Sequence, residues 1–223
     1  MNFRYDLALF DLDGTLTNSA PGIINGLKEG FRCIGWPIPD QKTLLRFIGP
    51  PLLNMLGVLY PEMTGEQASA LVAGYRRYYV ERGSYENEVY PGIFELLDDL
   101  RRGGVKLAVV TSKPVTQAKN ILSYFKLAER FDYISAEDDS EGGRGKEFLI
   151  RPALEHFGIP ASRAVMIGDT KYDAAGARKS GANFVGVMYG FGTRVEMERE
   201  NGKYFVDTVD ELRKFLIDKN KTK

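Results

Sequence analysis

The sequence predicts an α/β fold, with a Rossmann-like parallel sheet as its core and an inserted helical domain. Short apolar runs recur along the chain, and from about residue 88 onward amphipathic helical patterns lie between them. Residues 18–86 instead carry helical patterns with little strand signal, which predicts the insert. The expected division is residues 1–16 plus 88–223 for the core domain and residues 17–87 for the helical domain.

Four apolar runs have the character of buried parallel strands, because each is short and continuous and stops at a polar or glycine-containing turn. They are residues 7–10, 106–110, 164–167 and 184–188. The turns that follow them are residues 11–15, 111–114, 168–170 and 189–192. Ligands of open α/β sheets bind at the carboxyl ends of the strands, so these turns are the expected site.

Helical patterns join the core strands. Apolar residues recur at helical spacing over residues 93–100 and stop at Gly103. A second pattern covers residues 149–157 and stops at Gly158. The sequence TVDE at residues 208–211 has the spacing of a capping box, which predicts that a last helix begins there.

The predicted insert carries helical signals of its own. Ile23, Leu27 and Phe31 are spaced to share one helix face. The sequence TGEQ at residues 64–67 is a second capping box, and it opens a segment rich in tyrosine and apolar residues. The chain is expected to return to the core near residues 89–92.

Composition narrows the class of protein. The 223 residues are 43% hydrophobic, enough for a substantial core, and 30 Lys and Arg balance 30 Asp and Glu. This balance gives no support for a nucleic-acid or anionic-membrane partner. The single cysteine, Cys33, excludes an internal disulfide, and no run resembles a signal peptide or a membrane helix. We therefore expect a cytoplasmic protein, and the sequence leaves monomer or homodimer open.

The polar residues at the predicted strand ends complement one another chemically. Carboxylates, hydroxyls and one cation are expected there, from Asp11, Asp13, Thr111, Ser112, Lys146 and Asp169. Clustered carboxylates repel one another unless a cation or proton intervenes, and oxygen ligands favour Mg²⁺. A single cysteine and a single histidine argue against a zinc cluster and a Cys–His nucleophile. An aspartate then becomes the plausible nucleophile, since it needs no base to activate it.

Four motifs in order resemble those of haloacid dehalogenase-like phosphatases. They are DLDGTLT at residues 11–17, VVTSKP at residues 109–114, Lys146, and GDTKYD at residues 168–173. The resemblance covers nearly the whole chain. Residues 46–52, RFIGPPL, are similar to a loop of the phosphoglycolate phosphatase-like subgroup, as are residues 90–92 and 189–192.

The resemblance implies a role for each motif. Asp11 is the expected nucleophile, which forms an aspartyl-phosphate intermediate. Asp13 is the expected general acid and base, and its backbone carbonyl would join the side chains of Asp11 and Asp169 as Mg²⁺ ligands. Thr111 is expected to hydrogen-bond a phosphoryl oxygen, and Lys146 to neutralise charge between Asp11 and the phosphate.

Further positions follow from the same resemblance. Asp173 is expected to support the metal or Lys146. The expected substrate-binding residues are Gly14, Thr15, Arg46, Gly49, Thr111, Ser112, Lys113 and Lys146. The insert corresponds to a helical cap of the placement called C1. Asp13 favours phosphate chemistry, because the dehalogenase branch lacks an acid there.

Plainer roles remain open for several of these residues. Lys113 competes with Lys146 as the catalytic cation, and Asp173 has the position of an ordinary first-turn helix acid. Arg46 is equally well explained as a solvated helix charge. Thr111 has the position of a helix cap before Pro114.

The leading expectation is a Mg²⁺-dependent phosphatase that hydrolyses a small-molecule phosphate monoester, with phosphoglycolate the favoured substrate. A 5′-nucleotidase or a pyrophosphatase is the first alternative. A β-phosphoglucomutase-like phosphomutase is the second, and a non-enzymatic phospho-acceptor domain is the third. A Rossmann nucleotide-binding module ranks last, because no Gly-x-Gly-x-x-Gly turn follows the first strand.

Overall fold

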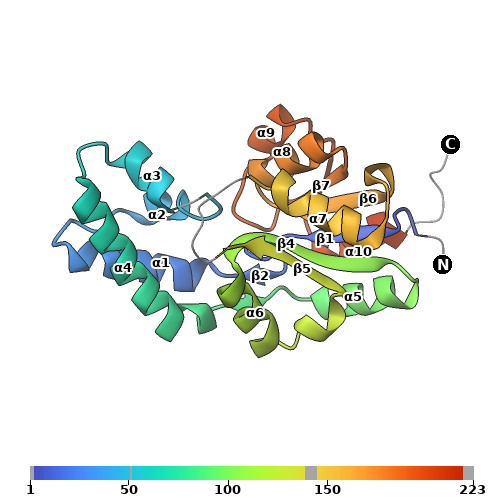
Figure 1. Ribbon diagram of the computed structural model, residues 1–223, viewed down its shortest axis with the longest axis horizontal. Helices are drawn as coiled ribbons and strands as arrows, with labels where there is room; N and C mark the ends of the chain where they lie inside the picture. Colours follow the sequence, from blue (N-terminus) through green and yellow to red (C-terminus); the bar gives the residue numbers. More distant parts are fainter. Residues whose placement is uncertain (1–2, 51, 139–144, 218–223) are drawn as a thin grey trace. The chain divides into compact units, whose positions relative to one another are not determined.

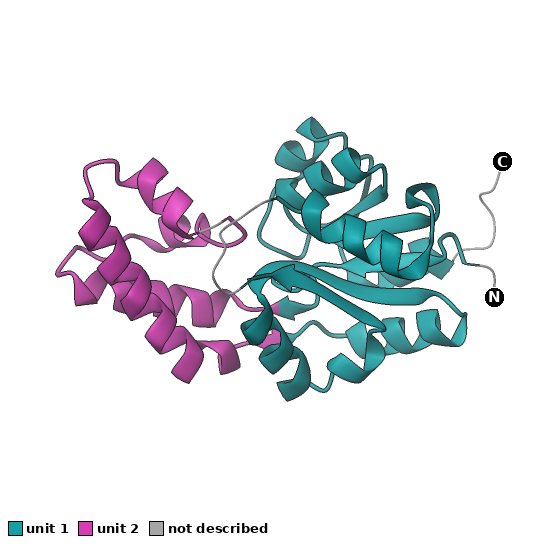
Figure 2. Ribbon diagram, in the orientation of Figure 1, with its two compact units in different colours: residues 1–17, 89–223 teal, residues 18–88 magenta. Residues whose placement is uncertain are grey.

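The computed structural model describes residues 3–50, 52–138 and 145–217. Residues 140–144 of the loop before Lys146, and Pro51 of the RFIGPPL segment, lie outside the described residues. The chain forms two compact units, Met1–Thr17 with Val89–Lys223 and Asn18–Glu88 (Figure 2). We call the first the core unit and the second the helical unit. Whether the helical unit acts as a cap stays a prediction.

The core unit is built on a six-stranded parallel sheet, of which the sequence predicts the parallel arrangement and four of the strands. In spatial order its strands are β5 (Tyr133–Glu137), β4 (Lys106–Pro114), β1 (Leu7–Phe10), β6 (Ala164–Gly168), β7 (Asn183–Val187) and β8 (Tyr204–Val206). The chain passes from β1 to β4 on one side and later returns to β6 on the other. This reversal of strand order is a topological switch point, the place where open sheets bind ligands.

Helices cover both faces of the sheet. Their bounds are α5 (Ile93–Arg102), α6 (Val115–Tyr124), α7 (Glu147–Phe157), α8 (Lys171–Ser180), α9 (Arg194–Arg199) and α10 (Val209–Ile217). Helices α5 and α6 lie on one face, and α7 and α8 lie on the other (Figure 1). Helix α9 packs on α8, and α10 packs on α5. The predicted α/β class is confirmed.

Apolar residues of the strands and of α7 and α8 make one side of the core. Members of this cluster are buried and come from alternate positions of the strands, as the pleat of a sheet requires. They are Leu7, Leu9, Ala108, Val110, Leu149, Ile150, Ala153, Ala164, Met166 and Ala177. Both faces of β1 are covered, since all four of its residues are buried. This explains the unbroken apolar run at residues 7–10.

Strands β5 and β8 were not predicted from the sequence. They are the two edge strands, and β5 carries Ser135 and Glu137 among its apolar residues while β8 has only three residues. Central parallel strands are continuous apolar runs, but edge strands need not be. Strand β4 also extends beyond the predicted run, through Pro114, with an irregular register after Thr111.

The helical unit contains four α-helices among the residues that the structure describes. They are α1 (Ala20–Cys33), α2 (Gln41–Leu45), α3 (Leu52–Leu59) and α4 (Gly65–Glu81). The Thr64–Gln67 capping box at the start of α4 is confirmed by both of its hydrogen bonds. Short strands β2 (Thr17–Asn18) and β3 (Glu88–Val89) pair with each other at the two points where the chain changes unit.

Two short glycine contacts explain how closely α1 and α4 pack. Cβ atoms at Gly26 and Gly30 would lie 3.0 Å from the ring of Tyr75 and 2.7 Å from the carbonyl oxygen of Leu71. Small residues are therefore required on this face of α1. Within the described part of the chain, no helix has the length and apolar character needed to cross a membrane.

Candidate active site

The ends of the three central strands form the candidate site. Phe10 of β1 is in register with Val109 of β4 and Ile167 of β6, so the polar residues that follow each strand lie at one edge. The backbone N–H of Asp11 donates to the carbonyl of Ile167 at 2.9 Å and thereby continues the sheet pairing by one residue. The Asp11 side chain is thus held by the sheet itself.

Lys146 connects two buried aspartates. Its Nζ lies 2.7 Å from Asp11 Oδ1 and 2.9 Å from Asp173 Oδ1, and the three residues are 5%, 7% and 0% exposed. Burial lowers the pKa of the lysine ammonium, but the carboxylates of Asp11 and Asp173 more than reverse this effect and raise it. The ammonium therefore stays charged throughout the physiological pH range.

Gly176 makes room for this lysine. A Cβ at Gly176 would lie 2.5 Å from the Cβ of Lys146, so a side chain on α8 would push the start of α7 away. Lys146 stands directly before the first residue of α7, and its position depends on how closely α7 packs on α8. The helix packing therefore fixes the cation of the site.

Asp173 lies at the start of α8 and is fixed by that helix. Its Oδ2 accepts hydrogen bonds from the backbone N–H of Thr170 at 3.0 Å and from the Thr170 hydroxyl at 2.7 Å. This is a capping box, so the plainer role as a helix acid is present. The same carboxylate holds Lys146 through its other oxygen, Oδ1. The two roles use different oxygen atoms.

Asp169 is enclosed by backbone rather than by large side chains. Its Oδ1 accepts from the Thr15 hydroxyl at 3.2 Å, and its Oδ2 accepts from the backbone N–H of Phe191 at 2.7 Å. Cβ atoms at Gly14 and Gly190 would each lie 2.3 Å from an atom of the Asp169 side chain. Gly14 also has a φ of +85°, which L side chains rarely adopt.

Two tyrosines support this enclosure from the core unit. The rings of Tyr90 and Tyr189 meet at 4.7 Å between centroids, and the Tyr189 hydroxyl donates to the carbonyl of Thr15 at 3.2 Å. Burial, together with the nearby Asp169 carboxylate, raises the pKa of both hydroxyls. Residues 189–192 are one of the strand-end turns at which the sequence predicts the site, but the sequence does not predict their contact with Asp169. The signal available was a glycine-rich turn at a strand end.

The carboxylates form a candidate metal centre. One oxygen of each of Asp11, Asp169 and Asp173 lies within 4.8 Å of the others, and all three residues are buried. Burial raises the pKa of Asp11 to about 7, with Lys146 opposing the rise and Asp173 adding to it. Burial and the carboxylates of Asp173 and Asp11 also raise the pKa of Asp169. One ammonium does not balance this charge, and the all-oxygen donor set fits a hard divalent cation such as Mg²⁺.

Asp13 and Thr111 lie at the same edge, and both contact Lys113. Asp13 Oδ2 forms an ion pair with Lys113 Nζ at 2.9 Å, and Thr111 Oγ1 accepts from the backbone N–H of Lys113 at 3.1 Å. The two lysines contact different aspartates, Lys146 contacting Asp11 and Lys113 contacting Asp13, and the choice of Lys146 as the catalytic cation stays a prediction. Ser112, between Thr111 and Lys113, is half-buried.

Arg46 and Gly49 belong to the helical unit. Arg46 follows α2 directly and is exposed, and Gly49 has a φ of +104°. Their predicted contact with substrate stays a prediction. His156, the single histidine, stacks on Tyr133 with ring centroids 4.5 Å apart.

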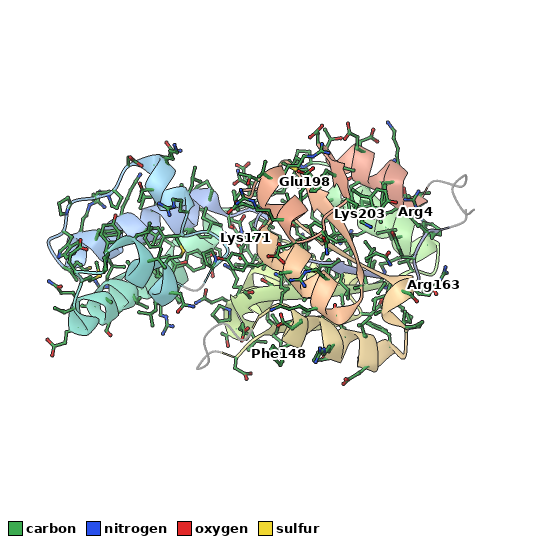
Figure 3. All side chains as sticks on the ribbon, turned by 90° about the horizontal axis from the view of Figure 1, so that it is seen from above. Arg4, Phe148, Arg163, Lys171, Glu198 and Lys203 are labelled. Atoms are coloured by element: carbon green, nitrogen blue, oxygen red, sulfur yellow. The ribbon has the colours of Figure 1, made fainter. Side chains whose placement is uncertain are left out.

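Lys171 is a basic neighbour of the site on the surface. This residue begins α8 and is labelled in Figure 3, and its Nζ pairs with Glu196 at 2.8 Å. Its side chain is 44% exposed, in contrast to the buried Lys146. Lys171 and Glu196 therefore form a surface ion pair, and such pairs contribute little to stability.

Known proteins match both the sequence and the fold of the chain. Residues 8–187 match the family model of haloacid dehalogenase-like hydrolases. The chain is 37% identical over 213 residues to a 5′-nucleotidase of Pseudomonas aeruginosa, and the match covers 96% of each chain. It is 35% identical to the tyrosine-protein kinase PtkA of Mycobacterium tuberculosis, over 94% of this chain and 72% of that protein. The crystal structure of a predicted phosphatase from Clostridium acetobutylicum is 41% identical and superposes with a TM-score of 0.87, over 94% of this chain and 97% of that one.

Proposed function

Because the chain belongs to the haloacid dehalogenase-like hydrolase family and is a phosphatase, we propose that it hydrolyses small-molecule phosphate monoesters. The proposed reaction uses Mg²⁺ and passes through a phosphorylated Asp11. The observation that carries the proposal is the placement of Asp11. It ends the central strand, its Oδ1 is held by Lys146, and it shares a buried carboxylate cluster with Asp169. This arrangement suits a nucleophile that must meet an anionic phosphate.

The first step is attack on phosphorus by a carboxylate oxygen of Asp11. Because Lys146 binds Oδ1, the second oxygen, Oδ2, is the one offered for attack. The bond from phosphorus to the ester oxygen breaks as the new bond forms, and Asp13 gives a proton to the departing alcohol. Lys146 stabilises the charge that develops between Asp11 and the phosphoryl oxygens, and Thr111 donates to one of those oxygens.

The second step returns Asp11 to its starting state. Asp13, now ionised, takes a proton from a water molecule as that water attacks the phosphorus of the aspartyl-phosphate. The bond between phosphorus and the Asp11 oxygen breaks, and inorganic phosphate leaves. A bound Mg²⁺, held by Asp11, Asp169 and the Asp13 carbonyl, would supply positive charge to the phosphoryl group.

A panel of phosphorylated metabolites tests this proposal. Phosphate release is measured from phosphoglycolate, nucleoside monophosphates, sugar phosphates and pyrophosphate, with Mg²⁺ and with EDTA, and Asp11→Asn serves as the blank. We expect Mg²⁺-dependent release that is absent from the variant. The relation to the Pseudomonas aeruginosa protein favours nucleoside monophosphates, whereas the RFIGPPL segment favours phosphoglycolate. Full activity of Asp11→Asn would rule out the proposed nucleophile.

The similarity to PtkA supplies a second candidate, in which a tyrosine hydroxyl replaces water as the final phosphoryl acceptor. Incubation with γ-labelled ATP separates the two, because label on tyrosine favours transfer to protein and label in inorganic phosphate favours hydrolysis. The phosphomutase alternative predicts instead that label moves between positions of a sugar phosphate without release. A phosphoprotein that persists for hours after treatment with acetyl phosphate would favour the phospho-acceptor alternative.

A further inference from the structure

We propose that Lys113 is a positioning residue that holds one oxygen of Asp13 and so presents the other oxygen to the leaving group of the substrate. This inference rests on the proposed function and adds a residue to it. It replaces the role expected from the sequence, in which Lys113 binds the substrate directly.

The backbone directs Lys113 toward Asp13. The register of β4 with β5 becomes irregular after Thr111, so Lys113 leaves the regular alternation of the strand. The Thr111 hydroxyl accepts from the backbone N–H of Lys113 at 3.1 Å and fixes this turn. The Lys113 side chain is only 6% exposed, and its Nζ lies 2.9 Å from Asp13 Oδ2.

The backbone of Asp13 is fixed as well. The next residue, Gly14, donates its N–H to the carbonyl of Thr17 at 2.8 Å, and Asp13 forms a single bridge with Thr17. With the main chain held, the remaining freedom of Asp13 is rotation of its side chain. The ion pair with Lys113 removes that freedom, because only one carboxylate oxygen faces the ammonium.

The other oxygen of Asp13 is the unusual one. Asp13 Oδ1 is buried and has no hydrogen-bond partner among the residues that the structure describes. Buried carboxylate oxygens almost always have a donor, and one without is costly unless a ligand supplies it. The attacking water carries such a donor, and in the first step a proton on Oδ1 would itself pass to the ester oxygen of the leaving group. Lys113 thus holds one oxygen of the carboxylate and leaves the other oxygen available for the reaction.

This geometry has a consequence that a substrate-binding lysine would not have. A general acid matters most when the leaving group is a poor one, such as an alkoxide, and little when it is an acidic phenol. Loss of Lys113 should therefore slow the cleavage of alkyl phosphates far more than that of p-nitrophenyl phosphate. A lysine that binds the phosphoryl group would affect all substrates equally.

The experiment compares kcat/KM for a series of aryl and alkyl phosphates in the wild-type enzyme, Lys113→Met and Lys113→Arg. The ratio kcat/KM reports the steps up to phosphoryl transfer, which include the proton donation. We expect Lys113→Met to lose roughly 100-fold with alkyl phosphates and little with p-nitrophenyl phosphate. Lys113→Arg keeps the charge and should recover part of the alkyl rate. Lys214→Met, which removes an exposed ion pair with Asp210, is the matched control and should match the wild type.

Two results would overturn the inference alone. One is an equal loss with every leaving group, and the other is a loss confined to substrates with a second anionic group, since both make Lys113 a substrate-binding cation. If Lys113→Met does not fold, Lys113→Arg decides by the same comparison, because its planar guanidinium cannot reproduce the lysine geometry. A wild-type enzyme that releases no phosphate from any substrate overturns the proposed function and this inference together.

Discussion

Replacement of Lys146 by methionine should destabilise the core unit in a way that depends on pH. The side chain of Lys146 is 3% exposed and lies between Asp11 and Asp173. Methionine has a similar volume but no charge, so the substitution leaves two buried carboxylates without their cation. Removal of one partner from a buried ion pair typically costs about 3–5 kcal/mol.

The sign of the pH dependence follows from Asp11. The lysine stays charged across the range, because its pKa is raised in the folded state, so the change comes from the carboxylate. Burial raises the pKa of Asp11 to about 7. At about pH 8 Asp11 is roughly 90% ionised and loses a strong partner, whereas at about pH 5.5 it is almost wholly protonated and loses little. We expect a destabilisation of about 4 kcal/mol at the higher pH and about 2 kcal/mol at the lower one, where the contact with Asp173 remains.

Urea denaturation in EDTA at these two pH values measures the change in the free energy of unfolding. Hydrogen exchange of the backbone amides of β1 and β4 serves as the readout. The single tryptophan, Trp36, lies in the helical unit and would report on the wrong part of the chain. Lys214→Met is the control, since its ion pair with Asp210 is exposed. A loss below about 1 kcal/mol at both pH values, or a larger loss at the lower pH, would refute the reasoning.

Three further predictions concern the enclosure of the carboxylates. Gly190→Ala should raise the Mg²⁺ concentration for half-maximal activity about tenfold or more, because the added Cβ would lie 2.3 Å from the Asp169 side chain. Titration of phosphate release with Mg²⁺ measures this concentration. Gly176→Ala should reduce kcat by displacing Lys146, and unchanged kinetics would show that α7 and α8 can separate without harm. Mg²⁺ should raise Tm more at about pH 8 than at about pH 5.5, because protons compete for Asp11 and Asp169, whose pKa values are raised; calorimetry at both pH values checks the order.

The fold class was predictable because the central strands are buried on both faces. Their side chains must all be apolar, and this requirement is directly visible as the apolar runs at residues 7–10 and 164–167. Edge strands need not be apolar throughout, and β5 contains Ser135 and Glu137, which is why the sequence does not predict it. Helices with a local signal were also predictable: the capping boxes at residues 64–67 and 208–211 mark the starts of α4 and α10, and Gly103 and Gly158 mark the ends of α5 and α7.

The site was predictable as a set of residues but not as a set of contacts. The turns that follow β1, β4 and β6 meet because parallel strands end at one edge, and this brings Asp11, Thr111 and Asp169 together. Which oxygen meets which cation depends on an irregular register in β4 and on the packing of α7 against α8. The pair between Lys113 and Asp13 comes from that irregularity, so sequence spacing alone could not reveal it.

The most direct measurement traps the phosphorylated enzyme. Asp13→Asn is mixed with Mg²⁺ and p-nitrophenyl phosphate, whose leaving group needs little help from a general acid. The mixture is quenched in acid and reduced with borohydride, which converts an aspartyl-phosphate to homoserine that mass spectrometry locates. We predict homoserine at position 11 alone, in larger amount than in the wild type because Asn cannot activate water, and none in Asp11→Asn. Phosphate on another residue, or an enzyme that turns over with no phosphorylated Asp11 at any time, would contradict the proposed mechanism.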